Sequence, residues 1–194
     1  MIVLDYVLAA TEADVRREAA ALRDRMLREL CGIDSPVIKR TASGKPYLVK
    51  DAGISFSVSH SGRLALCAVS FPGVARTARG TVLWDGASSP EVGADAEKVR
   101  PAEQAARLRK IAERFFPPSE IRLLRDAADT DVPQVFARSW TLCESYVKMT
   151  GEGFGAGFGA LDFAGIISPC FCVQDGEDMY ILRAAWREKE GGAV

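Results

Sequence analysis

The chain has 194 residues and a formal net charge of −1, from 25 basic and 26 acidic side chains. This length suffices for one larger domain or two small ones with a real core, and the balanced charge argues against a global basic field for nucleic acid or membranes. No uncharged stretch approaches a transmembrane helix, and the first residues lack the basic region of a signal peptide. We therefore expect a cytoplasmic protein with neither a nucleic-acid nor a membrane partner.

The first part of the chain alternates strand and helix patterns. Residues 2–9 are typical of a strand. Thr11 and Asp14 then predict a capping box before an amphipathic helix, which should end at Gly32. A loop at 42–48 leads into a further candidate strand.

Two strands and an insertion are predicted next. Residues 53–62 alternate apolar side chains with serines, which is the pattern of a half-buried strand, and the apolar run 64–71 predicts a central strand. Residues 72–91 are rich in Gly, Ser, Pro and Ala, which predicts a mobile or hairpin insertion with one weak strand, "TVLW".

The second part begins with a strand at 91–97 and a helix from Pro101 to Phe116, followed by a short helix in "PPSEIRLLRDA". Residues 133–150 predict a long helix, and the C-terminal segment holds two or three strands around a turn at 175–178. This order of elements indicates an α+β fold. It leaves two similar halves open, although no repeat of residues is visible.

Five cysteines and one histidine limit the chemistry. The cysteine count is odd and no C-x-x-C pair occurs, so we expect reduced, mostly buried thiols rather than a disulfide framework or a zinc ribbon. Because His60 is the only histidine, multi-histidine zinc sites are excluded. A metal ion would have to be held by carboxylates, which favours magnesium, manganese or calcium.

Paired carboxylates are the first candidates for such a site. Asp95 and Glu97 are two residues apart in a strand, so their side chains share a face, and Gly93 leaves room beside them. A divalent cation would neutralise the pair; an exposed polar strand face is the alternative. Glu144 borders the apolar face of its helix, one turn before Lys148. It is a candidate third ligand of the same cation, and an ordinary ion pair with Lys148 is the alternative.

Two further segments are candidates for binding anions. His60 lies between Ser59 and Ser61 before a glycine, and such a turn can present several donors to a phosphate. Lys45 follows a glycine and could also meet an anion. A hydrogen-bonded strand-end histidine and a surface turn are the alternatives. The glycine-rich run 150–160 imitates a dinucleotide fingerprint, but it follows a helix, so we interpret it as a flexible connection.

The order of the motifs is more specific than any one of them. "GKPYL", "FSVSHSG", "VGADAEKVRP", "RFFPPSE" and "WTLCESYVKMTGEG" follow one another over roughly residues 44–163 and resemble the Sfp-type 4′-phosphopantetheinyl transferases. The resemblance implies a monomeric pseudodimer of two similar α/β halves, residues 1–90 and 91–194, each with a small antiparallel sheet packed on a helix. It implies transfer of 4′-phosphopantetheine from coenzyme A, bound between the halves, to a serine of an apo acyl or peptidyl carrier protein. Mg²⁺, with Mn²⁺ as an alternative, would be the ion, and 3′,5′-ADP the released product.

The resemblance also implies roles for individual residues. The metal ligands would be Asp95, Glu97 and Glu144, the catalytic residues Glu144, Lys148 and Glu120, and the coenzyme A contacts Lys45, Ser59, His60, Ser61 and Lys148. Glu144, or a water that it orients, is the expected base for the carrier serine. Lys148 would bind the phosphates and favour the leaving group.

Three departures from the family pattern bear on activity. Cys143 stands where the helix of the family commonly has a lysine. Only 43 residues precede Gly44, so Lys39 and Arg40 would have to replace basic residues that relatives carry in a longer segment. The insertion at 72–91 could cover the cleft or meet the carrier.

Two other functions therefore stay open. One is a catalytically impaired module that binds coenzyme A or a carrier protein, and the other is a different metal-dependent phosphoryl-transfer enzyme or hydrolase that uses the same acidic residues. A stripe of basic residues on the first helix of the second half is either a rim for an acidic carrier or a solvated helix face. These residues are Arg107, Arg109, Lys110 and Arg114.

Overall fold

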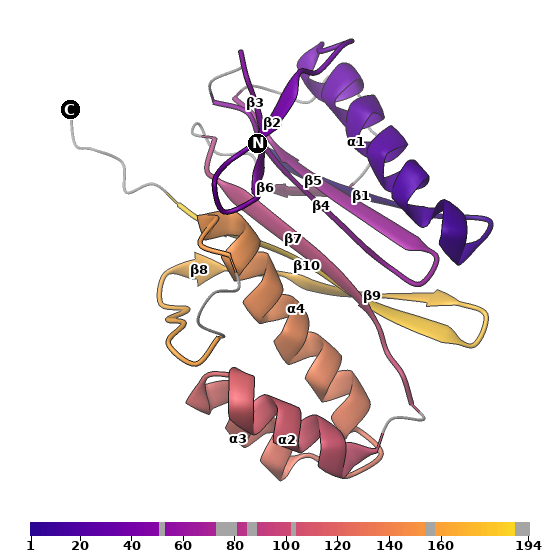
Figure 1. The fold of residues 1–194 in the computed structure, drawn as a ribbon, viewed down its shortest axis with the longest axis vertical. Helices are drawn as coiled ribbons and strands as arrows, with labels where there is room; N and C mark the ends of the chain where they lie inside the picture. Colours follow the sequence, from indigo (N-terminus) through magenta and orange to yellow (C-terminus); the bar gives the residue numbers. More distant parts are fainter. Residues whose placement is uncertain (51–52, 73–80, 85–88, 102–103, 154–157, 189–194) are drawn as a thin grey trace.

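The structure is a computed structural model that describes residues 1–194 except 51–52, 73–80, 85–88, 102–103, 154–157 and 189–194. Its layers follow the order helix, sheet, sheet, helix (Figure 1). The outer layers are α1 (Val15–Cys31) and α4 (Val132–Thr150). The small sheets are antiparallel, so the α+β class is confirmed.

The first sheet has the strand order β4-β5-β1-β6. Its strands are β1 (Ile2–Leu8), β4 (Ser55–Ser61), β5 (Leu64–Ser70) and β6 (Thr81–Trp84). Each matches a predicted strand, and β5 is central, as its continuous apolar run indicates. One face packs on α1, whose predicted apolar residues are all buried and which ends at Gly32 with φ +76°. Residues 73–80 and 85–88 of the predicted 72–91 insertion lie outside the described residues.

Two local predictions in this part are corrected. A short 3-10 turn, η1 (Glu12–Asp14), precedes α1, and no capping box forms, because the Thr11 hydroxyl donates to the Asp14 carboxylate at 2.7 Å instead of accepting from a backbone N–H. A two-stranded hairpin, β2 (Ile38–Arg40) with β3 (Pro46–Leu48), adds a strand that we did not predict. Three residues are too few to show a period in sequence.

The second sheet has the order β7-β10-β8, with β9 also paired to β10. The strands are β7 (Val92–Lys98), β8 (Ile166–Ile167), β9 (Cys170–Asp175) and β10 (Asp178–Arg187). The turn at 175–178 joins β9 to β10 as predicted, with Gly176 at φ +59°. The inner faces of the two sheets form a shared apolar core.

Helices α2 (Ala105–Phe115) and α3 (Pro118–Asp126) pack on α4, the helix predicted at 133–150. Helix α2 begins later than the predicted start at Pro101, because Gln104 still has an extended backbone and its carbonyl accepts the first helical hydrogen bonds. Rings from these helices and the following loop stack into one cluster. The cluster consists of Phe116, Phe136, Trp140 and Phe158.

The serine face of β4 is buried, so the prediction of a half-buried strand is wrong. The exposed fractions of Ser57, Ser59 and Ser61 are 5%, 7% and 8%. Serine hydroxyls accept hydrogen bonds from backbone N–H groups of β7, which has no strand partner on that edge. The pairs are Val92 with Ser55 at 3.2 Å, Ala94 with Ser57 at 2.9 Å and Lys98 with Ser61 at 3.0 Å. The hydroxyls thus satisfy an edge that would otherwise bury unpaired donors.

None of the five cysteines forms a disulfide. Cys67 and Cys143 are buried, whereas Cys172 is exposed on β9, so burial is less general than expected. In the described part of the chain no helix has the length and apolarity needed to cross a membrane.

Candidate active site

Helix α4 lies unusually close to β7, and Gly93 makes this possible. A Cβ atom at Gly93 would lie 1.8 Å from the carbonyl oxygen of Ser145 and 2.5 Å from the backbone nitrogen of Met149. Asp95 is on the same face of β7 by strand alternation. The close approach therefore brings the last turns of α4 onto the carboxylate of Asp95.

Lys148 is the centre of the resulting cluster. Its Nζ lies 2.6 Å from Asp95 Oδ1 and 3.9 Å from Glu144 Oε2, and it donates to Ser59 Oγ at 3.0 Å. Ser59 in turn donates to Asp95 Oδ1 at 2.7 Å. The structure thus joins four of the predicted site residues, contributed by β4, β7 and α4.

The carboxylates are close but do not by themselves form a cage. Asp95 is 4% exposed, and its Oδ2 is buried with no hydrogen-bond partner. Glu97 accepts from Ser61 at 3.3 Å and lies 3.6 Å from an Arg100 nitrogen. Within the described ranges, no group of three or more His, Cys, Asp or Glu side chains is arranged to hold a metal ion. The ammonium of Lys148 supplies positive charge between Asp95 and Glu144.

Glu144 has an unusual protonation behaviour. Burial, and then the charge of Asp95, raise the pKa of Glu144 to about 7, against the opposing effect of Lys148. A hydrogen bond from the side chain of Trp140 also favours the charged form. A carboxyl group that titrates near neutral pH is suited to accepting and releasing a proton.

This raised pKa predicts a pH-dependent stability in EDTA-containing, metal-free buffer. Between about pH 4.5 and about pH 7 the folded state keeps a proton on Glu144 that the unfolded chain has lost, so this group lowers the free energy of unfolding as pH rises. Glu144→Gln should therefore gain stability relative to the parent across that window, on the order of 2 kcal/mol by pH 8. Urea unfolding of both proteins at pH 5, 6, 7 and 8 measures the difference. A difference that is the same at every pH would contradict the assignment.

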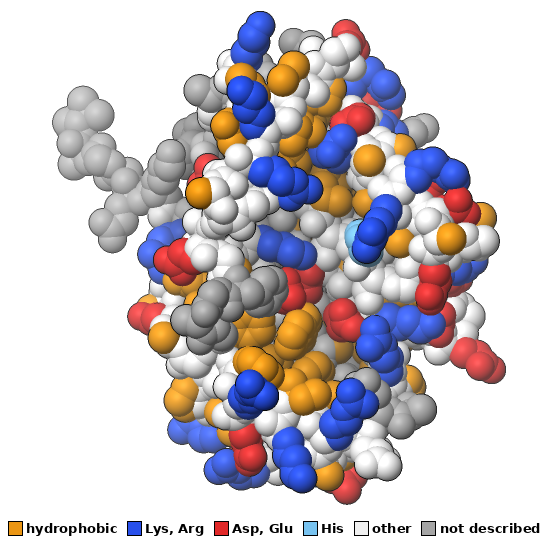
Figure 2. Space-filling model, in the orientation of Figure 1, with side chains coloured by type: hydrophobic (Ala, Val, Ile, Leu, Met, Phe, Trp, Pro, Cys, Tyr) orange, Lys and Arg blue, Asp and Glu red, His pale blue; other side chains and the backbone are white. Residues whose placement is uncertain are grey.

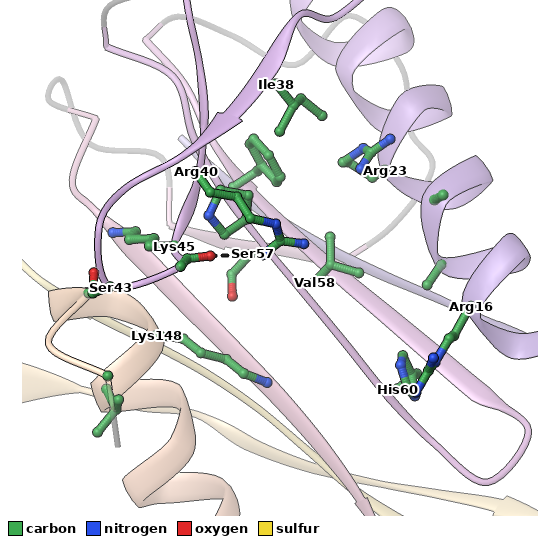
Figure 3. Close-up of a pocket in the computed structure, with 18 residues that line it drawn as sticks. Arg16, Arg23, Ile38, Arg40, Ser43, Lys45, Ser57, Val58, His60 and Lys148 are labelled. Carbon is green, nitrogen blue, oxygen red and sulfur yellow. Dashed lines mark hydrogen bonds between the residues drawn. The ribbon is translucent and has the colours of Figure 1, made fainter. Parts of the chain in front are cut away.

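A cavity of about 500 Å³ opens beside the cluster, between α1, the β2–β3 hairpin, β4 and the end of α4 (Figure 3). Its lining has an apolar part that includes Ile38, Phe56 and Val58. The lining holds several basic side chains and, among the residues described, no carboxylate. The basic residues are Arg16, Arg23, Arg40, Lys45, His60 and Lys148.

The side chain of His60 lies on the opposite face of β4 from those of Ser59 and Ser61, because side chains alternate along a strand. His60 lies within the strand rather than after it, and it points into the cavity beside Arg16 (Figure 3). Burial, and then the charges of Arg16 and Lys148, lower the pKa of His60. Ser59 and Ser61 point instead toward Asp95 and Glu97.

Lys45 lines the cavity but is already engaged. Its ammonium donates to the carbonyl of Met149 at 2.7 Å and pairs with the carboxylate of Glu91. It therefore fastens the loop before β3 to the C-terminal end of α4, where carbonyl groups favour a cation.

Glu120 lies in a different environment from Glu144. It is 8% exposed on α3 and accepts from the hydroxyl of Ser139 at 2.7 Å. Burial, and then the charges of Glu120 and Glu144, raise the pKa of Cys143, so this thiol is neutral. Arg183 of β10 has the opposite influence on Cys143.

Several residues of the site were not predicted from sequence. Arg16 and Arg23 reach the cavity from α1, where the sequence shows them only as the polar side of an amphipathic helix. Arg183 lies near the site because its strand, β10, pairs with β7 in a register that places Arg183 opposite Asp95. The role of Trp140 in orienting Glu144 has a sequence signal, the spacing of four on one helix, but the apolar pattern alone assigns Trp140 to the core.

Comparison with known proteins gives consistent matches. A family model described as the 4′-phosphopantetheinyl transferase superfamily matches residues 91–180. The 4′-phosphopantetheinyl transferase HetI of Nostoc sp. (strain PCC 7120) is 36% identical over 113 residues, which cover 57% of this chain and 39% of HetI. The 4′-phosphopantetheinyl transferase Sfp of Bacillus subtilis (strain 168) is 28% identical over 110 residues, again 57% of this chain and 39% of that protein.

The matches therefore span about two fifths of the length of these curated relatives. The matched segment includes β7 and α4, and with them Asp95, Glu144 and Lys148. On this match and these relatives, residues 91–180 match the 4′-phosphopantetheinyl transferase superfamily, and the similarity to HetI and Sfp supports a transferase of the Sfp type.

Proposed function

We propose that this protein transfers 4′-phosphopantetheine from coenzyme A to a serine of an apo acyl or peptidyl carrier protein, with Mg²⁺, and releases 3′,5′-ADP. One observation carries the proposal: Asp95 and Glu144 lie beside Lys148, and Lys148 lines a cavity with several other cations. The names of the relatives support the same reaction for this chain.

The cavity has the properties that coenzyme A requires. Its volume of about 500 Å³ falls within the range of small-molecule sites. The apolar side chains suit a base, and the basic ones suit phosphate groups. Lys148 lies at the end of the cavity that adjoins Asp95, so we assign the diphosphate to that end.

The carboxylates suit a hard divalent ion, although the three do not already surround one point. The buried Oδ2 of Asp95 lacks a partner, and Glu144 and Glu97 supply further oxygen atoms. Such oxygen donors are those that Mg²⁺ prefers. These three residues would hold the ion, which when bound neutralises the charge of the diphosphate.

The chain's own residues then account for the proton and the leaving group. Glu144 would accept the proton of the carrier serine while the serine oxygen forms a bond to the β-phosphorus of coenzyme A. The bond between that phosphorus and the bridging oxygen breaks, and 3′,5′-ADP leaves. Lys148 would offset the charge that develops on the departing phosphate. We give Glu120 a supporting role near α4, through Ser139.

We also infer that residues 1–90 and 91–194 are the two related halves of a monomeric pseudodimer. Each contributes a small antiparallel sheet covered on its outer face by one helix, α1 or α4. The serines of β4 connect the halves along β7.

The test is a mass-shift assay. The purified chain with MgCl₂, coenzyme A and a panel of apo carrier proteins should give a carrier heavier by one phosphopantetheine, and EDTA should prevent the shift. No mass shift with any carrier of fatty-acid, polyketide or nonribosomal-peptide type would overturn the proposal.

A second candidate rests on Cys143, which is buried and neutral at the position beside Glu144. If the missing cation has ended catalysis, the protein would bind coenzyme A or a carrier without transfer. Calorimetry would then show coenzyme A binding while the mass-shift assay stays negative.

A further inference from the structure

The ammonium group of Lys45 is turned away from the cation-lined cavity, the space of about 500 Å³ between α1, the β2–β3 hairpin, β4 and the end of α4. The stem of Lys45 belongs to the lining and lies close to Gly151, where an added Cβ would be 3.0 Å from Lys45 Cδ. Figure 3 shows the nitrogen atom of Lys45 pointing away from those of His60 and Lys148. In this orientation the charge of Lys45 is directed out of the space that we assign to the donor.

Two groups hold the ammonium in this orientation. It donates to the carbonyl oxygen of Met149 at 2.7 Å, and it forms an ion pair with the carboxylate of Glu91. Both partners line a neighbouring cavity of about 890 Å³, and neither lines the cation-lined cavity. Lys45 therefore reaches from the wall of one cavity to the wall of the next.

The carboxylate of Glu91 is placed to hold Lys45 and also to release it. The hydroxyl of Ser55 donates to the same oxygen of Glu91 at 3.1 Å, and it accepts from the N–H of Val92 at 3.2 Å. The side chain of Glu91 is nevertheless 65% exposed, so water can solvate the carboxylate when the ammonium leaves. An ion pair with one solvent-exposed partner is weak, and another anion can replace it.

A phosphate group in the cation-lined cavity is such an anion. Its oxygen atoms accept hydrogen bonds from an ammonium as a carboxylate does, and rotation of the long Lys45 side chain exchanges one acceptor for the other. The surface around the cavity attracts anions. In Figure 2, Lys and Arg side chains gather over the part of the face where Figure 1 places α1 and the β2–β3 hairpin.

We propose that Glu91 is an autoinhibitory anion, which occupies the ammonium of Lys45 in the free protein and is displaced by a phosphate group of the donor. The inference rests on the proposed function for the identity of the donor, coenzyme A. It gives Lys45 two states, one paired with Glu91 beside the end of α4 and one turned into the cation-lined cavity.

The first test compares two substitutions that remove one negative charge. Glu91→Gln keeps an acceptor for Ser55 but frees Lys45, so calorimetric binding of coenzyme A with MgCl₂ at low ionic strength should tighten about threefold to fivefold. The control is Glu177→Gln, at an exposed position of the turn before β10 that lines neither cavity, and it should change the affinity by less than about twofold. Unchanged or weaker binding by Glu91→Gln would overturn the proposal.

A second variant asks whether the effect passes through Lys45. In Lys45→Met the shared ammonium is gone, so adding Glu91→Gln should alter the affinity for coenzyme A by less than about twofold. If Glu91→Gln tightens binding as much in this background as in the parent, Glu91 acts only through its general charge, and the competition is rejected.

Carbon-13 NMR of the Glu91 carboxyl group gives a readout that does not depend on affinity. The resonance is identified by its loss in Glu91→Gln, and saturating coenzyme A should move it toward its position in Lys45→Met. A resonance that coenzyme A leaves in place would overturn the proposal even if the mass-shift assay is positive. Failure of coenzyme A to bind either the parent or Glu91→Gln would overturn both proposals. Displacement of Glu91 together with a negative mass-shift assay would reject the transferase and keep the autoinhibitory role of Glu91.

Discussion

Asp95→Asn is expected to reduce phosphopantetheine transfer by about 100-fold to 1,000-fold, the loss typical of removing one group that stabilises charge in a transition state. The amide keeps the shape of the side chain but removes the charge that pairs with Lys148 at 2.6 Å. It also removes one of the three acidic groups that we assign to the metal ion. Mass spectrometry of the carrier at fixed Mg²⁺ and coenzyme A measures the loss.

A second readout separates this role from a loss of folding. Because the charge of Asp95 raises the pKa of Glu144, Asp95→Asn should lower the pKa of Glu144 in the folded protein, which NMR titration can follow. The matched control is Asp178→Asn, which removes an ion-paired carboxylate at the tip of the β9–β10 hairpin. If Asp95→Asn transfers phosphopantetheine at a rate within about threefold of the parent, and the control is also active, the assignment of Asp95 to the metal site is rejected.

Gly93→Ala is expected to have the largest effect on stability. The added Cβ would lie 1.8 Å from the Ser145 carbonyl oxygen, a backbone atom that cannot rotate away. Helix α4 would have to move off β7, and overpacking that shifts backbone costs about 3 kcal/mol or more. For a chain of this size the melting temperature should fall by roughly 10 °C.

The same substitution links stability to the site. If the variant folds, the shift of α4 should separate Lys148 from Asp95 and lower transfer even below the melting temperature. Gly159→Ala is the control, because a Cβ there meets no atom within 4 Å and its φ is not positive. Calorimetric melting curves of the two variants give the comparison. A Gly93→Ala protein as stable as Gly159→Ala would contradict the close contact between α4 and β7 at Gly93.

Apolar residues that recur with a period of two or 3.6 predicted most strands and helices. This works because an element that buries one face carries apolar side chains at that spacing in its own sequence. The apolar stripe of α1, the apolar run of β5 and the glycine turn before β10 are examples. The late start of α2 and the short strand β2 were missed. Their boundaries depend on backbone partners, Gln104 and β3, that no local pattern identifies.

The serines of β4 show most clearly what a local sequence pattern cannot predict. Alternation with apolar residues indicates a polar face, but it does not say whether water or another part of the protein meets that face. Here β7 meets it, and hydroxyl groups satisfy the backbone of an edge strand. A hydroxyl is equally compatible with both environments, so composition carries no signal for the difference.

The sequence by itself determined the order of the motifs, and with it the resemblance to the transferases. It also identified the candidate site residues, which are Asp95, Glu97, Glu144 and Lys148. Only the tertiary structure decided that Lys148 lies against Asp95 and that the α1 arginines line the same cavity. The reason is that residue types and their spacing along one element are local properties. The partners of a charge are set by which elements pack together, as α4 packs on β7 over the missing side chain of Gly93.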